Sequence, residues 1–198
     1  MENTTQRTKK TDLHRLCLMA LFVALIFLLG QTPLGLIPLG WCNVTLLVIP
    51  VAVGTLLMGL KSGMELGLAF GMTSFLSALL KPSVLVGTLM GASPVLTAVM
   101  TFVPRLCVPA VIYFVNKALS RKWPKASMPI ACALGSVTNT VLYLGMMLLF
   151  YTMLGIDNVS VLAAIGATAG GAGPAEAVAA ALIAPPIVLA MRKVNRKR

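Results

Sequence analysis

Six long apolar runs, separated by short polar segments, most constrain what this chain can fold into. About 20 consecutive apolar residues suffice for a helix to cross a lipid bilayer. Hydrophobic residues make up 58% of the 198 residues and charged residues 11%, with a mean hydropathy of +0.93. That balance is too apolar for a soluble domain of this length. The chain is therefore predicted to be an all-α integral membrane protein that folds as one compact bundle.

We expect six transmembrane helices, whose ends are set by charges, prolines and glycines. The first run follows a basic segment, as in a signal peptide, but the five runs after it favour a retained transmembrane helix. Lys61 ends the second helix, and Lys81-Pro82 ends the third. The expected helices cover residues 16–30, 44–60, 62–80, 95–116, 128–154 and 174–191.

Basic residues predict the orientation of the bundle. Of the 16 Lys and Arg residues, 14 fall in the N-terminal segment, the turn at Lys61, the loop 117–125 and the C-terminal tail. By the positive-inside rule both termini are expected to be cytoplasmic. The connectors 31–43, 81–94 and 155–173 are then outside, and the last is expected to be a flexible gate or linker because it is rich in glycine. The net charge of +11 thus indicates topology, and no nucleic-acid partner is expected.

The segment from Thr101 to Tyr113 places Arg105 between two prolines inside an apolar run. A central arginine costs a transmembrane helix roughly 2.5 to 3.5 kcal/mol, so it is expected to face a protein interior or a wet cavity and to have a partner. Pro104 cannot donate to the carbonyl of Met100, and Pro109 cannot donate to the carbonyl of Arg105 itself. The freed backbone groups and the guanidinium together predict one wall of a binding cavity.

Other polar residues are expected to complete this cavity in the outer half of the bundle. The candidates are Asn43 at the start of the second helix, Thr138-Asn139-Thr140 and Tyr143 on the fifth helix, and Glu176 in the first turn of the sixth. Three of them have a structural alternative. Glu176 would only neutralise Arg105, Asn139 would only bridge two helices, and Asn43 would only cap the second helix.

The sequence lacks the motifs of the common enzyme classes. It contains no Gly-x4-Gly-Lys-Ser/Thr phosphate loop, so ATP hydrolysis by the P-loop route is not expected. The sole histidine, His14, is at the cytoplasmic side, and two outward acids are too few for a metal-dependent site. The four cysteines are far apart without metal-ligand spacing, so no disulfide, metal or cofactor is expected. A solute-binding or solute-moving protein is favoured over an enzyme.

Ala20 and Ala24 lie four positions apart on one face of the first helix, where their small size lets another helix approach closely. With this pair, the short six-helix chain resembles the substrate-binding (S) components of energy-coupling factor (ECF) vitamin transporters. The resemblance covers nearly the whole chain. Besides the alanine pair, it rests on the segments Ile37–Thr45, Val48–Gly54, Gly71–Ser74, Phe102–Arg105 and Gly135–Thr140.

The resemblance implies that this chain works with other proteins. An S component binds a vitamin from outside with high affinity and docks on a transmembrane coupling protein through the small-residue face of helix one, here Ala20 and Ala24. Two cytoplasmic ATPases drive the cycle, in which the S component topples within the membrane to release its substrate inside. The resemblance also implies a multi-pass protein of the bacterial cell membrane, with its pocket at the outer ends of helices four to six and a gate in the external loops.

The chain looks most similar to the branch that includes pantothenate, pyridoxine and folate S components. Pantothenate is favoured by its chemistry, because it has one carboxylate for Arg105 and offers hydroxyls and an amide to Asn139, Thr138 and Glu176. Sparse aromatic residues argue against a large flat ring as substrate. One alternative is another vitamin: pyridoxine, folate, cobalamin or riboflavin. A second is a stand-alone secondary carrier, but no convincing internal repeat is seen. A third is a membrane scaffold, which would leave Arg105 with no purpose beyond pairing.

Overall fold

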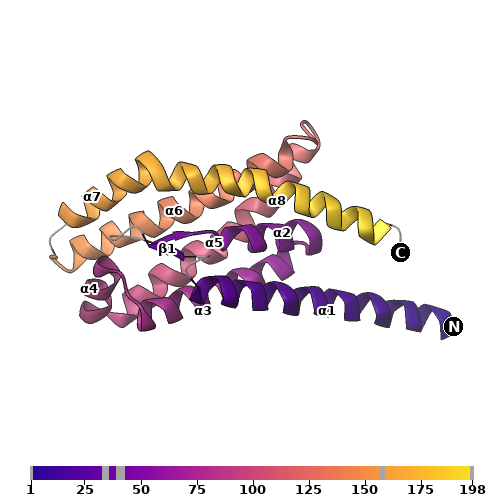
Figure 1. The fold of residues 1–198 in the computed structure, drawn as a ribbon, viewed down its shortest axis with the longest axis horizontal. Helices are drawn as coiled ribbons and strands as arrows, with labels where there is room; N and C mark the ends of the chain where they lie inside the picture. Colours follow the sequence, from indigo (N-terminus) through magenta and orange to yellow (C-terminus); the bar gives the residue numbers. More distant parts are fainter. Residues whose placement is uncertain (1, 33–35, 39–42, 157–158, 197–198) are drawn as a thin grey trace.

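The computed structural model describes residues 2–32, 36–38, 43–156 and 159–196, which form a helical bundle with one short hairpin (Figure 1). In chain order the elements are α1 (Glu2–Gln31), β1 (Leu36–Pro38), β2 (Asn43–Thr45), α2 (Val48–Met58), α3 (Leu60–Leu80), α4 (Val84–Ala92), α5 (Pro94–Ser120), α6 (Ser127–Met153), α7 (Val159–Ala167), the π-helical segment η1 (Thr168–Ala172) and α8 (Gly173–Arg196).

Six of these helices correspond to the six expected from the sequence. The ends of α3 and α6 fall within two residues of the prediction, whereas α5 and α8 run about one turn further toward their C-terminal ends. Helix α1 begins well before residue 16, so the polar N-terminal segment continues the first helix rather than preceding it. The described residues thus confirm the predicted helical class.

The second helix begins later than predicted. The helix was expected to begin at residue 44, but residues 43–45 form strand β2, which pairs antiparallel with β1 so that Asn43 lies opposite Pro38. The β-branched side chains in this strand favour extended backbone. Leu47 holds the N-cap position of α2, so the alternative in which Asn43 caps this helix is wrong.

Two connectors that were expected to be loops contain helices instead. Helix α4 lies between Pro82 and Ser93, and helix α7 continues through η1 into α8 across the glycine-rich run. The prediction of a flexible loop over 155–173 is therefore wrong for residues 159–173, which are helical. Glycine weakens helices in water, but in an apolar setting each unpaired backbone group costs several kcal/mol, and a helix satisfies these groups internally.

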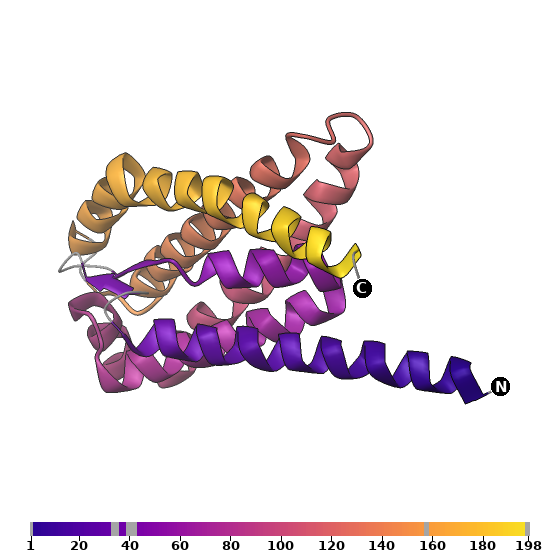
Figure 2. The same ribbon diagram turned by 45° about the vertical axis from the view of Figure 1, so that its right-hand side comes forward.

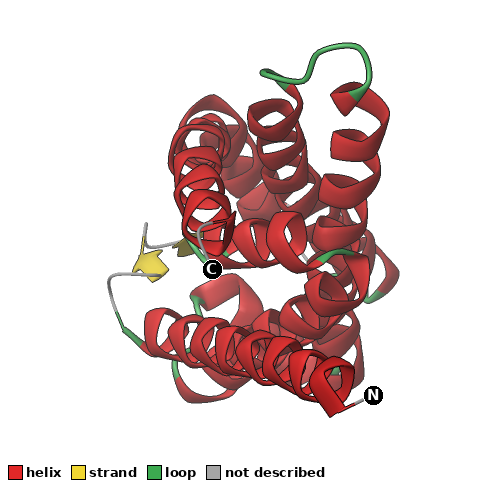
Figure 3. Ribbon diagram, turned by 90° about the vertical axis from the view of Figure 1, so that its right-hand side faces the viewer, coloured by secondary structure: helices red, strands yellow, loops and turns green. Residues whose placement is uncertain are grey.

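Both termini lie at one end of the bundle, and α4 and α7 lie at the opposite end (Figures 1 and 2). Seen from the end that carries the termini, α1 runs along one side of the other helices (Figure 3). Helices α3, α5, α6 and the run Val159–Val194 are long and apolar enough to cross a membrane, and the apolar helices Arg15–Gln31 and Val48–Met58 are shorter. Six crossings with cytoplasmic termini remain a prediction.

Glycines bring α3 into direct contact with α5. Gly63, Gly67 and Gly71 recur every fourth residue on the face of α3 that packs on α5. A Cβ atom on Gly67 would lie 2.7 Å from the carbonyl oxygen of Arg105, and one on Gly71 would lie 2.7 Å from the ring of Phe102. Small residues of this kind drive close helix packing inside membranes. These three glycines therefore set how closely α3 approaches Arg105.

This packing predicts that Gly67→Ala destabilises the protein. The new methyl group would meet backbone rather than a flexible side chain, and overpacking typically costs about 1 to 3 kcal/mol. We expect a lower thermal unfolding temperature in detergent, by roughly 2 to 4 °C per kcal/mol.

Gly145→Ala is the matched control, because nothing lies within 4 Å of a Cβ atom added there. Its unfolding temperature should stay the same or rise, since alanine favours a helix. Equal unfolding temperatures for the two variants would contradict direct contact between α3 and the backbone of α5.

Candidate functional site

Arg105 is buried in the middle of α5, with 4% of its surface exposed. Its Nη1 atom donates a hydrogen bond of 3.2 Å to the carbonyl oxygen of Met100. That carbonyl is the one that Pro104, four residues later, leaves without a helical donor. The prediction that proline frees a backbone acceptor beside the guanidinium is confirmed, and the arginine itself occupies this acceptor.

Two aromatic rings from neighbouring helices contact the Arg105 guanidinium. Its Cζ atom lies 4.5 Å from the ring centroid of Tyr143 on α6 and 5.3 Å from that of Phe70 on α3. Cation–π contacts of this kind contribute about 2 kcal/mol or more where water is excluded. Tyr143 was predicted to belong to the site, but Phe70 was not, because nothing distinguishes its sequence position from other apolar residues in the third helix.

Glu176 supplies the negative charge near Arg105. It lies in the first turn of α8 and is 8% exposed, and its charge attracts the guanidinium. Its Oε2 atom also accepts a hydrogen bond of 3.4 Å from Oγ1 of Thr140 on α6. The structure therefore brings together Arg105, Tyr143, Thr140 and Glu176, four of the candidate residues, from three helices.

Several buried polar atoms in this region have no hydrogen-bond partner within the described residues. They include Nε of Arg105, Oδ1 of Asn139 and Oγ of Ser74. Asn139 precedes Tyr143 by four residues and Ser74 follows Phe70 by four, so each shares a helix face with a ring that contacts Arg105. An unpaired buried polar group costs about 1 to 3 kcal/mol, which a ligand with complementary groups would recover.

Ser74 was not predicted as a site residue. Its sequence neighbourhood, Gly71 to Ser74, was noted only as part of the family resemblance, and a serine in a transmembrane helix carries no local pattern of its own. The second unpaired serine hydroxyl, that of Ser136, lies on α6 one turn before Asn139 and is fully buried. Polar side chains thus line the interface of α3, α5 and α6.

Two predicted residues are not placed beside Arg105. The hydroxyl of Thr138 is exposed and donates to the carbonyl of Leu134 in its own helix, at 2.7 Å. Its neighbours Val137 and Val141 are also exposed, so this part of α6 faces outward. The backbone of Asn43 lies in β2, and its side chain falls outside the described residues, as does that of His14. A role of Thr138 or Asn43 in substrate binding stays a prediction.

Ala20 and Ala24 are exposed on α1. The exposed side chains Leu21, Leu25 and Leu28 accompany them, so the outer face of α1 is apolar and partly built from small residues. Such a face suits contact with lipid or with another transmembrane helix. A role in docking stays a prediction.

A buried cation that contacts aromatic rings and a backbone carbonyl, with a carboxylate nearby, is typical of membrane proteins that bind or move solutes. The family model described as ECF transporter, substrate-specific component, matches residues 14–188. The chain belongs to this family, and it is a multi-pass membrane protein.

One relative is similar along nearly its entire length. The chain is 28% identical over 205 residues to the pantothenic acid transporter PanT of Lactococcus lactis subsp. cremoris. The alignment covers 94% of this chain and 98% of that protein. A substrate-binding component of a transporter, rather than an enzyme, agrees with both comparisons.

The two threonines on either side of Asn139 provide a test of the site. Thr140→Val removes a hydrogen bond to a buried carboxylate, which should cost on the order of 1 kcal/mol and lower the unfolding temperature by roughly 2 to 4 °C. Thr138→Val removes only an exposed hydroxyl that bonds within its own helix, so its unfolding temperature should stay near that of the parent protein. A larger loss at Thr138 than at Thr140 would show that the face of α6 is assigned wrongly.

Proposed function

We propose that this protein is the high-affinity substrate-binding subunit of an ECF-type importer and that its substrate is pantothenate. The family supports a vitamin-transporter role, and the 28% identical PanT relative supports the choice of vitamin. The observation that carries the proposal is the buried Nε atom of Arg105, which has no partner among the described residues. An anionic group of the substrate would pair with it.

Each polar group of pantothenate has a candidate partner among the residues near Arg105. Its carboxylate accepts a charge-assisted hydrogen bond from Arg105, which is about twice as strong as a neutral one. Its amide and hydroxyls pair with Asn139 and Glu176. Ser74 has its hydroxyl inside the bundle, whereas the hydroxyl of Thr138 faces outward, so Ser74 is the better placed of the two.

Other vitamins fit the site less well. Flavin and pterin rings need a flat aromatic surface on which to stack, but the rings of Phe70 and Tyr143 already contact the Arg105 guanidinium. Pyridoxine has no carboxylate to pair with Arg105. A stand-alone secondary carrier would need further buried charges to couple an ion gradient, and Arg105 and Glu176 are the only charged side chains that are buried among the described residues.

Arg105 and the substrate carboxylate should depend on each other. Arg105→Ala should lose about 2 to 5 kcal/mol of pantothenate binding, the usual cost of removing one member of a buried charge pair. Pantothenyl alcohol, which has a hydroxyl in place of the carboxylate, should bind the parent protein more weakly than pantothenate does. The variant should bind both compounds equally weakly. Isothermal calorimetry on monodisperse protein measures all four affinities.

Arg121→Ala serves as the control, because that arginine is exposed after the end of α5. It should leave all affinities unchanged. If Arg105→Ala folds and still prefers pantothenate over the alcohol, Arg105 does not recognise the carboxylate and the choice of vitamin loses its chemical support.

The transport cycle requires a partner, because the S component supplies no ATPase in this proposal. We propose that the exposed pair Ala20 and Ala24 forms the surface that docks on the coupling protein. Association of helices in a membrane depends on close packing, which a large side chain at either position would prevent.

Ala20→Trp or Ala24→Trp should therefore abolish ATP-driven uptake in vesicles that also contain the coupling protein and the two ATPases. Pantothenate binding by the isolated variant should stay within twofold of the parent protein, because neither alanine shares a helix with the polar cluster. Ala118→Trp is the control, since Ala118 is exposed on α5 at the end that carries the termini. Intact uptake by both α1 variants would show that this face does not dock.

A further inference from the structure

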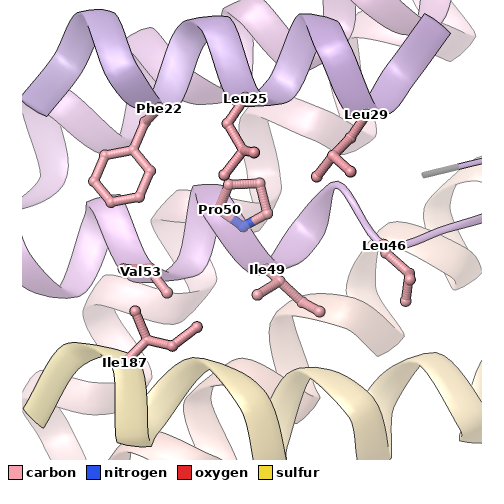
Figure 4. A pocket seen from close by; sticks show the side chains of 8 residues that line it. All are labelled: Phe22, Leu25, Leu29, Leu46, Ile49, Pro50, Val53 and Ile187. Atoms are coloured by element: carbon pink, nitrogen blue, oxygen red, sulfur yellow. The ribbon is translucent and has the colours of Figure 1, made fainter. Parts of the chain in front are cut away.

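The turn between α5 and α6, residues 121–126, joins two helices of 27 residues each. A helix of that length is about 40 Å long, and a bilayer with its headgroups is about 40 to 45 Å thick. The turn therefore lies at the depth of the lipid headgroups. It is at the end of the bundle that carries the termini, across the bundle from α1 and from the apolar groove between α1, α2 and α8 (Figures 2, 3 and 4).

Exposed basic side chains gather at this turn and at the helix end before it. We call them the α5–α6 basic patch, which consists of Lys117, Arg121, Lys122 and Lys125. The sequence has no Asp or Glu between Glu65 and Asp157, so α5, the turn and α6 supply no carboxylate to neutralise the patch. Its positive charges are therefore available to a partner.

The described arginines elsewhere at this end of the bundle are used differently. Arg15 on α1 donates from Nη2 to Oγ of Ser62 at 2.7 Å, and Arg192 on α8 donates from Nη2 to the carbonyl of Leu56 at 2.8 Å. These two side chains tie α1 and α8 to α3 and α2. The basic patch makes contacts of another kind, with aromatic rings.

Two rings hold ammonium groups of the patch at a defined depth. Nζ of Lys117 lies 5.8 Å from the ring centroid of Tyr113, and Nζ of Lys122 lies 5.5 Å from that of Trp123. Trp123 is 55% exposed, and Phe114, whose ring meets that of Tyr113 edge-on, is 58% exposed. Tryptophan and tyrosine favour the boundary between hydrocarbon and headgroups. The rings thus place the cations where lipid phosphates lie.

This combination selects among anionic partners. A nucleic acid or an acidic protein segment would meet the charges but leave Trp123 and Phe114 exposed to water. A bilayer presents phosphate at one depth and hydrocarbon directly beneath it, which matches cations beside exposed rings. The positive-inside rule accounts for the presence of the charges in this turn, but it does not require contact between them and any particular lipid.

We propose that the α5–α6 basic patch binds the headgroups of anionic phospholipids and enriches them beside this hairpin. Each Lys or Arg near a membrane surface raises the affinity for an anionic lipid about fivefold. The surface lies away from the face of α1 proposed for docking, so lipid and coupling protein do not compete for it. Nothing in this proposal depends on the identity of the transported substrate.

Trp123 can report on its own lipid neighbours. Trp41→Phe leaves it as the sole tryptophan, and this background is used throughout, after each protein is shown to be monodisperse with the parent's helix content. The whole chain is placed in vesicles of phosphatidylcholine and phosphatidylglycerol. In two matched preparations the same amount of brominated acyl chain, which quenches tryptophan on contact, is carried by one lipid or by the other. Brominated phosphatidylglycerol should quench Trp123 at least about twofold more strongly.

The variant Arg121→Gln/Lys125→Gln removes two charges and leaves both ring contacts in place. Its quenching should become nearly equal for the two lipids. Lys81→Gln is the matched control, because Lys81 is exposed at the C-terminal end of α3, at the opposite end of the bundle, and it should keep the parent's preference. Equal quenching by the two lipids in the parent background would overturn the proposal. So would an undiminished preference in the double variant, because these charges would then not select the lipid.

Discussion

The buried guanidinium of Arg105 is the interaction on which the rest of the structure depends. A charge inside an apolar bundle is tolerated only when several groups compensate for its lost hydration. Here each group comes from a different source: the carbonyl of Met100 within α5, the ring of Tyr143 on α6, the ring of Phe70 on α3, and the carboxylate of Glu176 on α8. Four helices must pack in one arrangement for the charge to remain buried.

Close packing of α3 on α5 makes this arrangement attainable. Gly67 lies against the backbone of Arg105 itself, and Gly71 lies against Phe102, so Phe70 between them is held at contact distance from the guanidinium. The glycines contribute no polar group to the site. They set the helix separation, and the separation determines which side chains can reach the charge.

Local rules predicted the relation between Pro104 and Met100 within α5, and they missed the residues that α3 contributes to the site. Pro104 and the carbonyl of Met100 are four residues apart, so their relation follows from helix geometry alone. Phe70 and Ser74 belong to the site only because α3 lies beside α5, which no local pattern reveals. Helices α4 and α7 were misjudged because breaker residues were given the weight they have in water, whereas a membrane favours any backbone that pairs its own polar groups. Strand β2 was assigned to a helix because its extended form depends on pairing with β1.

The chain thus keeps two proposed roles apart in space: substrate binding by the polar cluster between α3, α5, α6 and α8, and docking by the exposed small-residue face on α1. Solid-state NMR on pantothenate labelled with ¹³C in its carboxylate, bound to protein with ¹⁵N-labelled arginine, tests the first most directly. The account predicts strong dephasing of the carboxylate signal by guanidinium nitrogen at hydrogen-bond distance. A bound carboxylate whose signal shows no dephasing would contradict it.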